Sequence, residues 1–237
     1  MKKHIPNILT CGNLITGCVS LQLAALGHLE VAASLIFVAA FFDFLDGFAA
    51  RLLKVKSLIG VDMDSLADVV SFGCAPAMIL FSWIKHSLHN LPPDILNITG
   101  VSWLPYVAFI VPAFSAFRLA RYNHDEQQTF EFRGLPTPAN AFFLGFLPFA
   151  AEFLPFLSNP WVLTGIVLCF SILLVTDIPM FALKFKHFRF QDNELRYIFL
   201  FISLMLILVF RLGAFPIVIL TYILISLITL LIHKMKS

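Results

Sequence analysis

Charged side chains are scarce in this sequence. They make up 13% of its 237 residues, whereas about a quarter of an ordinary soluble domain is charged. Hydrophobic residues account for 59%, and the mean hydropathy is +0.90. This balance excludes a typical soluble domain and predicts an integral membrane protein. The net charge of +2 is too small and too dispersed to indicate nucleic acid, so we expect no such partner.

Cysteine is also rare, and the sequence lacks obvious internal divisions. The four cysteines lie in apolar stretches without C-x-x-C spacing, so neither a zinc site nor a disulfide framework is indicated. There is no Ser/Gly-rich linker, charged tail or internal repeat. We therefore expect one membrane domain over residues 1–237.

Long apolar runs fill most of the sequence. A membrane-spanning helix needs roughly 20 mostly apolar residues, and the runs are too uniformly apolar for the alternating strands of a membrane barrel. The predicted fold class is therefore all-α: a polytopic membrane protein with about eight transmembrane helices. The predicted spans are 8–27, 31–53, 66–84, 101–121, 139–157, 161–180, 195–211 and 214–233.

Basic residues are distributed unevenly between the loops. If the N-terminus is cytoplasmic, only Lys85 and Arg211 of the 16 basic residues fall on the opposite side. Positive residues favour the cytoplasmic side of a membrane. We therefore expect a multi-pass protein of the cytoplasmic membrane, with both termini and the chemistry facing the cytoplasm.

Five carboxylates gather in one stretch, DFLDGFAARLLKVKSLIGVDMDSLAD. Asp43 and Asp46 share one face at the end of the second predicted span, and Asp64 and Asp68 share a face at the start of the third. Four carboxylates can therefore converge from two antiparallel neighbouring helices. Asp62 points about 160° away from Asp64 at roughly 100° per residue, and we expect it to be expendable.

Converging anions in a membrane require cations. Each buried ionised group costs several kcal/mol unless it is paired, and hard divalent cations suit carboxylate oxygens. Two such metals about 4 Å apart form a site for phosphoryl chemistry. Gly47 and Ala50 have small side chains on the same helix face, which leaves room for a phosphate or nucleotide. Close helix packing also uses small residues. Arg51 suits a phosphate clamp or a snorkelling anchor equally well.

The same stretch resembles the signature of the CDP-alcohol phosphatidyltransferase family, D-x2-D-G-x2-A-R-x8-G-x3-D-x3-D. Every spacer is intact over Asp43, Asp46, Gly47, Ala50, Arg51, Gly60, Asp64 and Asp68. The segments PNILTCGN, FRLARYN and FRGLPTPAN are similar to segments of bacterial and archaeal members that act on L-serine. The motifs place a catalytic core at about 1–140 and leave C-terminal helices at about 141–237.

The resemblance implies an enzyme that transfers the phosphatidyl group from CDP-diacylglycerol to L-serine, giving phosphatidylserine and CMP. It also implies a homodimer in contact with membrane lipid, and two divalent ions, Mg²⁺ or Mn²⁺ with Ca²⁺ as the alternative. The implied metal ligands are Asp43, Asp46, Asp64 and Asp68, and Asp68 is also the implied general base. The implied nucleotide and diphosphate positions are Gly47, Ala50, Arg51 and Gly60, with Pro6, Asn7 and Thr10 bordering the nucleotide.

The acceptor site is the least defined part. A serine carboxylate favours arginine, and Arg118, Arg121 and Arg133 are candidates, although positive-inside bias also explains them. Glycerol phosphate, inositol phosphate or an aminoalcohol remain alternative acceptors. A cation transporter is a further alternative, but it predicts acids along a path, and only Glu152 and Asp177 lie in other predicted spans. A purely structural scaffold does not explain four converging acids.

Overall fold

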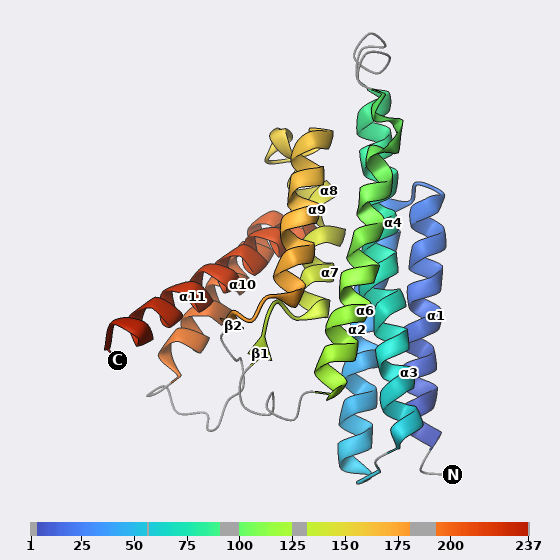
Figure 1. Ribbon diagram of the computed structural model, residues 1–237, viewed down its shortest axis with the longest axis vertical. Coiled ribbons are helices and arrows are strands. Elements are labelled where there is room, and N and C mark those ends of the chain that lie inside the picture. The colour runs from blue at the N-terminus through green and yellow to red at the C-terminus, as the bar shows by residue number, and fades with distance from the viewer. Residues whose placement is uncertain (1–3, 56, 91–99, 125–131, 181–192, 237) are drawn as a thin grey trace.

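The computed structural model describes residues 4–55, 57–90, 100–124, 132–180 and 193–236. These residues are helical almost throughout (Figure 1). The exception among them is one short antiparallel pair of strands, β1 (Phe132–Arg133) and β2 (Pro179–Met180). The predicted all-α class is confirmed.

Five helical stretches of the described chain are long and apolar enough to cross a membrane. They are α1 (Ile5–Ala25), α2 (Leu29–Leu52), Leu58–His89, Val101–Asn123 and Glu194–Leu231. A shorter apolar helix is α9 (Pro160–Val175). The last long stretch contains α10 (Glu194–Phe210) and the first part of α11 (Ala214–Lys236), separated by η6 (Arg211–Gly213). A polytopic membrane protein is therefore confirmed.

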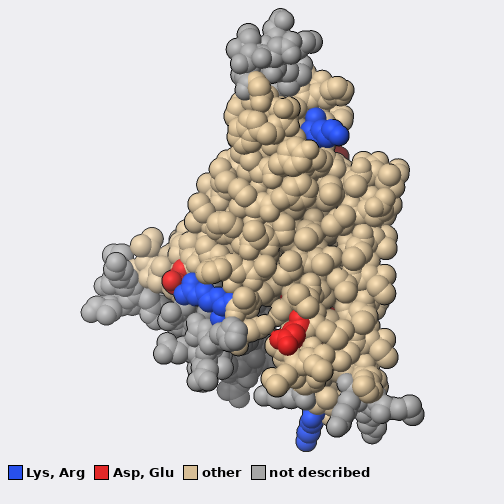
Figure 2. All heavy atoms as spheres, turned by 45° about the vertical axis from the view of Figure 1, so that its right-hand side comes forward, with Lys and Arg blue, Asp and Glu red and all other residues tan. Residues whose placement is uncertain are grey.

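The surface fits this conclusion. On the face shown in Figure 2, charged side chains lie toward the lower end and near the top, and a broad belt between them shows none. Many large apolar side chains are exposed, among them Phe41, Phe44 and Phe48 of α2. Such a surface suits lipid rather than water.

The third helical stretch begins earlier than predicted, at Leu58 rather than at residue 66. Its first helix, α3 (Leu58–Asp68), is capped by Ser57, whose Oγ accepts a hydrogen bond from the Gly60 N–H at 3.3 Å. It continues through a π-helical turn, η2 (Val69–Cys74), into α4 (Ala75–His89). Asp64 therefore lies inside a helix rather than at its beginning. The predicted span began too late because the charge of Asp64 lowers the local hydropathy without interrupting the helix.

The continuous helix predicted over 139–157 is wrong. The chain forms α7 (Thr137–Gly145), α8 (Leu147–Ala150) and a 3₁₀ turn, η5 (Pro155–Ser158). Pro148 has no N–H for the carbonyl of Leu144, and its ring clashes with that carbonyl in a straight helix. The helix therefore breaks at Phe146.

The helices that carry the acidic stretch pack together at one side of the molecule. α1 and α2 lie alongside each other, and α3, η2 and α4 pack against α1. The 3₁₀ segment η3 (Val101–Phe109) and α6 (Ile110–His124) complete this group, and α10 and α11 lie beyond α7 and α9 (Figure 1). Ser20 of α1 donates a buried hydrogen bond to the Ala32 carbonyl of α2 at 2.7 Å, which helps to hold the pair together.

Candidate active site

Three carboxylates from α2 and α3 lie close together. Asp43 comes from α2, and Asp64 and Asp68 come from α3; one carboxylate oxygen of each lies within 4.8 Å of the others. Asp68 is buried, with 8% of its surface exposed. Oδ1 of Asp64 is buried without a hydrogen-bond partner. An unsatisfied carboxylate oxygen among two other carboxylates suits a divalent cation, so this cluster can hold a metal ion.

A tight reversal of the chain produces this meeting. α2 ends at Leu52, Lys54 adopts a left-handed φ of 53°, and α3 begins at Leu58. The two helices therefore run in opposite directions at the lower end of Figure 1. On such helices the acidic faces can meet several residues away from the turn.

Asp46 lies outside this group of three. It is buried, with 5% exposed, and its Oδ2 accepts a hydrogen bond from Thr10 Oγ1 at 2.7 Å. Asp46 and Asp64 both line the cavity described below. Three of the four predicted ligands thus cluster tightly, and the fourth stands at the cavity wall beside them. Asp62 is exposed, as the helical periodicity predicted.

Asn13 of α1 is a residue that the sequence reasoning missed. Its side chain is fully buried, and Nδ2 donates a hydrogen bond to Asp68 Oδ1 at 3.1 Å. The Asn13 carbonyl in turn accepts a hydrogen bond from Ser71 Oγ at 3.0 Å. One signal was present: Asn13 follows Thr10 by three residues in an apolar span, which places both on one helix face.

A cavity of about 410 Å³ opens beside Asp46 and Asp64, between α1, α2 and α3. Six of the seven residues predicted for the nucleotide and diphosphate line it: Pro6, Asn7, Thr10, Gly47, Ala50 and Gly60. Arg51 is not among the lining residues; it is exposed, and its Nη2 lies 3.9 Å from where a Cβ on Gly47 would be. The structure therefore places Arg51 at the edge of the cavity rather than inside it.

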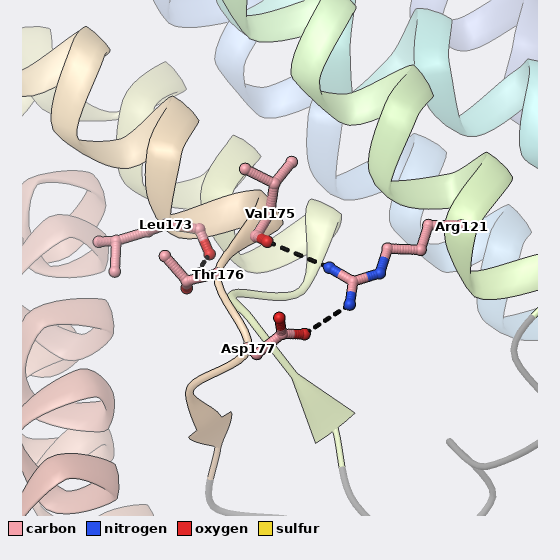
Figure 3. A network of polar contacts seen from close by, with 5 residues as sticks. All are labelled: Arg121, Leu173, Val175, Thr176 and Asp177. Atoms are coloured by element: carbon pink, nitrogen blue, oxygen red, sulfur yellow. Dashed lines mark hydrogen bonds and ion pairs between the residues drawn. The ribbon is translucent and has the colours of Figure 1, made fainter.

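The three candidate acceptor arginines have different surroundings. Arg118 is partly buried, and its Nη1 donates to Thr137 Oγ1 at 2.8 Å. Arg121 is exposed; Nη2 forms an ion pair with Asp177 Oδ1 at 2.6 Å, and Nη1 donates to the Val175 carbonyl at 3.4 Å (Figure 3). The backbone of Arg133 pairs in β1, and its side chain lies outside the described residues.

Comparison with known proteins defines the class of this enzyme. Residues 3–176 match the model of the CDP-alcohol phosphatidyltransferase family, which is well over half of the chain. The chain therefore belongs to this family of membrane transferases. The match includes the carboxylates and the cavity, and it extends through α9, beyond the motifs that could be recognised in the sequence.

Individual relatives carry a more specific name, CDP-diacylglycerol–serine O-phosphatidyltransferase. The relative from Bacillus subtilis (strain 168) is 32% identical over 192 residues, covering 81% of this chain and 94% of the relative. The relative from Methanocaldococcus jannaschii is 30% identical over 197 residues, covering 82% and 79%. The relative from Mycobacterium leprae (strain TN) is 34% identical over 185 residues, covering 74% of this chain but 57% of that longer protein.

Proposed function

We propose that this enzyme transfers the phosphatidyl group from CDP-diacylglycerol to L-serine and releases CMP. The observation that carries the proposal is the carboxylate cluster of Asp43, Asp64 and Asp68 beside a cavity of about 410 Å³. A family match and relatives named for the same reaction support it. We also propose that residues 1–237 act as one domain.

The carboxylates fit divalent metal ions. Their donors are hard oxygens, and one of them, Asp64 Oδ1, lacks a partner in the interior. We propose that Asp43, Asp46, Asp64 and Asp68 hold two ions, Mg²⁺ or Mn²⁺ with Ca²⁺ as the alternative. When bound, such ions neutralise the charge on the transferred phosphoryl group and on the departing CMP.

Side chains of the protein carry out the proton transfer and position the substrates. Asp68 takes the proton from the serine hydroxyl as that oxygen forms a bond to the lipid-linked phosphorus, and the bond from phosphorus to CMP breaks. Asn13 holds one oxygen of Asp68 during this step. Gly47 and Gly60 leave room at the cavity wall for the nucleotide and diphosphate, and Arg51 at its edge contacts a phosphate.

A panel of acceptors tests the reaction. The purified full-length enzyme is mixed with CDP-diacylglycerol and Mn²⁺, and CMP is measured with L-serine, glycerol 3-phosphate, inositol 1-phosphate or ethanolamine. We expect release with L-serine. Release only with another acceptor would replace serine in the proposal, and no release with any acceptor would favour the transporter alternative.

Metal binding has its own test, independent of turnover. We expect Mn²⁺ to raise the melting temperature of the wild-type enzyme and to give a bound Mn²⁺ signal by electron paramagnetic resonance. Both effects should weaken in Asp64→Asn, because a neutral amide is a poorer ligand. Equal binding by this variant and the wild type would contradict the assignment.

We further propose that the site and both termini face the cytoplasm and that the enzyme is a homodimer. Asp62→Cys in a variant without native cysteines tests the orientation, since residue 62 is exposed near the site. A membrane-impermeant maleimide should label it in inverted vesicles and not in right-side-out vesicles. The mass of the purified enzyme in detergent measures the oligomer.

A further inference from the structure

A second polar cluster lies inside the molecule, on α6 and α7. Ser115 and Arg118 are one turn apart on α6, and Thr137 and Asn140 are one turn apart on α7. The Arg118–Thr137 hydrogen bond joins the two helices. Ser115, Thr137 and Asn140 are completely buried. None of these four residues is among those that line the 410 Å³ cavity.

Several polar atoms in this cluster have no partner. They are Ser115 Oγ, Arg118 Nε, and both Nδ2 and Oδ1 of Asn140. Buried polar groups in proteins are nearly always hydrogen-bonded, because an unpaired one loses its interaction with water without replacement. Asn140 is one turn from Thr137, which binds the Arg118 guanidinium, and its whole amide lacks partners. This arrangement indicates a place that a polar ligand completes.

The cluster packs against the segment that follows the proposed general base, Asp68. α6 and α7 both contact η2, the π-helical turn that begins directly after Asp68. A Cβ added to Gly73 of η2 would lie 3.3 Å from the Ser115 Cβ. A molecule held by this cluster is thus close to the group that must take its proton.

The charge of Arg118 is not neutralised by a neighbouring acid. Arg121 has Asp177 as its counter-ion, whereas no carboxylate in the described part of the chain lies within ion-pair distance of Arg118. Its one described side-chain partner is the neutral hydroxyl of Thr137. A guanidinium binds a carboxylate more strongly than a hydroxyl, through two parallel hydrogen bonds. An incoming carboxylate can therefore displace Thr137.

We propose that Arg118, Asn140 and Ser115 form the subsite for an amino-acid acceptor. This inference rests on the proposed function and assigns its acceptor to one place. Arg118 binds the carboxylate, and Asn140 Oδ1 and Ser115 Oγ accept hydrogen bonds from the ammonium group, which leaves the hydroxyl directed toward Asp68. The subsite is closed in this structure. The acceptor therefore enters between α6 and α7, where the hydrogen bond between Arg118 and Thr137 breaks as the acceptor carboxylate replaces the Thr137 hydroxyl. Arg121 instead ties α6 to the chain after α9 through Asp177.

Steady-state kinetics of the full-length enzyme in CDP-diacylglycerol vesicles test this subsite. Arg118→Gln, Asn140→Leu and Ser115→Ala should each raise the KM for L-serine about 10- to 100-fold, the loss expected for a hydrogen bond to a charged group. The KM for CDP-diacylglycerol should stay within about twofold of the wild type. Asp177→Asn, which breaks the Arg121 ion pair, is the control and should change neither value.

The acceptor itself gives a second measurement. Ethanolamine lacks the carboxylate, so Arg118→Gln should lower the preference for L-serine over ethanolamine about tenfold or more, while Asp177→Asn keeps it. Melting temperatures report whether each variant folds. Ser115→Ala is the smallest of these changes, and it tests the subsite if Asn140→Leu does not fold.

The outcomes separate this inference from the proposed function. If the wild type releases CMP with L-serine but Arg118→Gln and Ser115→Ala keep its serine KM, the subsite is wrong and the function stands. A larger effect of Arg121→Gln than of Arg118→Gln would also overturn the subsite. Absence of serine-dependent CMP release by the wild type removes the proposed function and the subsite with it.

Discussion

Nδ2 of Asn13 lies 3.1 Å from Oδ1 of Asp68 and joins α1 to the carboxylate cluster. The Asn13 side chain is fully buried, and Ser71 Oγ of η2 donates a hydrogen bond to the Asn13 carbonyl. Asp68 is thus fixed by a residue 55 positions earlier in the chain. The orientation of the proposed base therefore depends on how α1 packs against η2.

Removal of the Asn13 amide should slow the chemical step. We expect Asn13→Ala to lower kcat about 10- to 100-fold, as is usual when a partner of a metal-ligating carboxylate is lost. The KM for CDP-diacylglycerol should change little, because Asn13 is not among the residues that line the cavity. Steady-state rates of CMP release measure both values.

Ser20→Ala is the matched control for this experiment. It removes a buried hydrogen bond from the same face of α1, to the Ala32 carbonyl, without touching the carboxylates. We expect it to lower the melting temperature but to keep kcat. If Asn13→Ala and Ser20→Ala reduce kcat equally, Asn13 has no specific role in positioning Asp68.

Two carboxylates of α3, Asp62 and Asp68, should differ sharply in their importance for turnover. Asp68 is buried in the cluster, whereas Asp62 is exposed to solvent on the same helix. Asp68→Asn should reduce turnover by at least about 100-fold, because a general base typically contributes 10²- to 10⁴-fold. Asp62→Asn should keep most activity. A comparable loss in both variants, with both proteins folded, would contradict this division.

The sequence predicted those features that depend on local spacing. Helical periodicity was enough to separate Asp62 from Asp64, because both lie on one regular helix. The family signature predicted that Gly47 and Gly60 accompany the acids, and both line the same cavity. These features needed only the geometry of single helices and the chain reversal between them.

Contacts between distant segments could not be predicted in the same way. Nothing in the spacing of Asn13 indicates that its partner is Asp68, since the packing of α1 on α3 decides it. Similarly, Arg118 and Arg121 look alike in sequence, and only the position of Asp177 after α9 distinguishes them. The break at Phe146 was missed because hydropathy counts Pro148 as one residue among many apolar ones.

Close packing between α1 and η2 should make Gly17 sensitive to any side chain. A Cβ at Gly17 would lie 2.8 Å from the Ser71 Cα, a backbone atom that cannot move aside on its own. Gly17→Ala should therefore destabilise the enzyme by about 1–3 kcal/mol, the usual cost of overpacking. Thermal unfolding in detergent measures this change. Gly165→Ala on α9, where a Cβ meets nothing within 4 Å, is the control and should have a much smaller effect.

Gly47 allows a direct test of the cavity. A Cβ there would have only Arg51 Nη2 within 4 Å, at 3.9 Å, so a larger side chain fits without a clash and points into free space. Gly47 also lines the cavity, and a valine at this position would occupy space proposed for the nucleotide.

We therefore expect Gly47→Val to remain folded, with a melting temperature within a few degrees of the wild type, but to bind CDP-diacylglycerol at least about tenfold more weakly, a loss of roughly 1.4 kcal/mol. Gly165→Val, an equal change on an exposed face of α9, should keep the wild-type affinity. Equilibrium binding of labelled CDP-diacylglycerol without acceptor measures this directly. Because the nucleotide and the side chain compete for one volume, unchanged affinity in a folded Gly47→Val enzyme would mean that the nucleotide binds elsewhere.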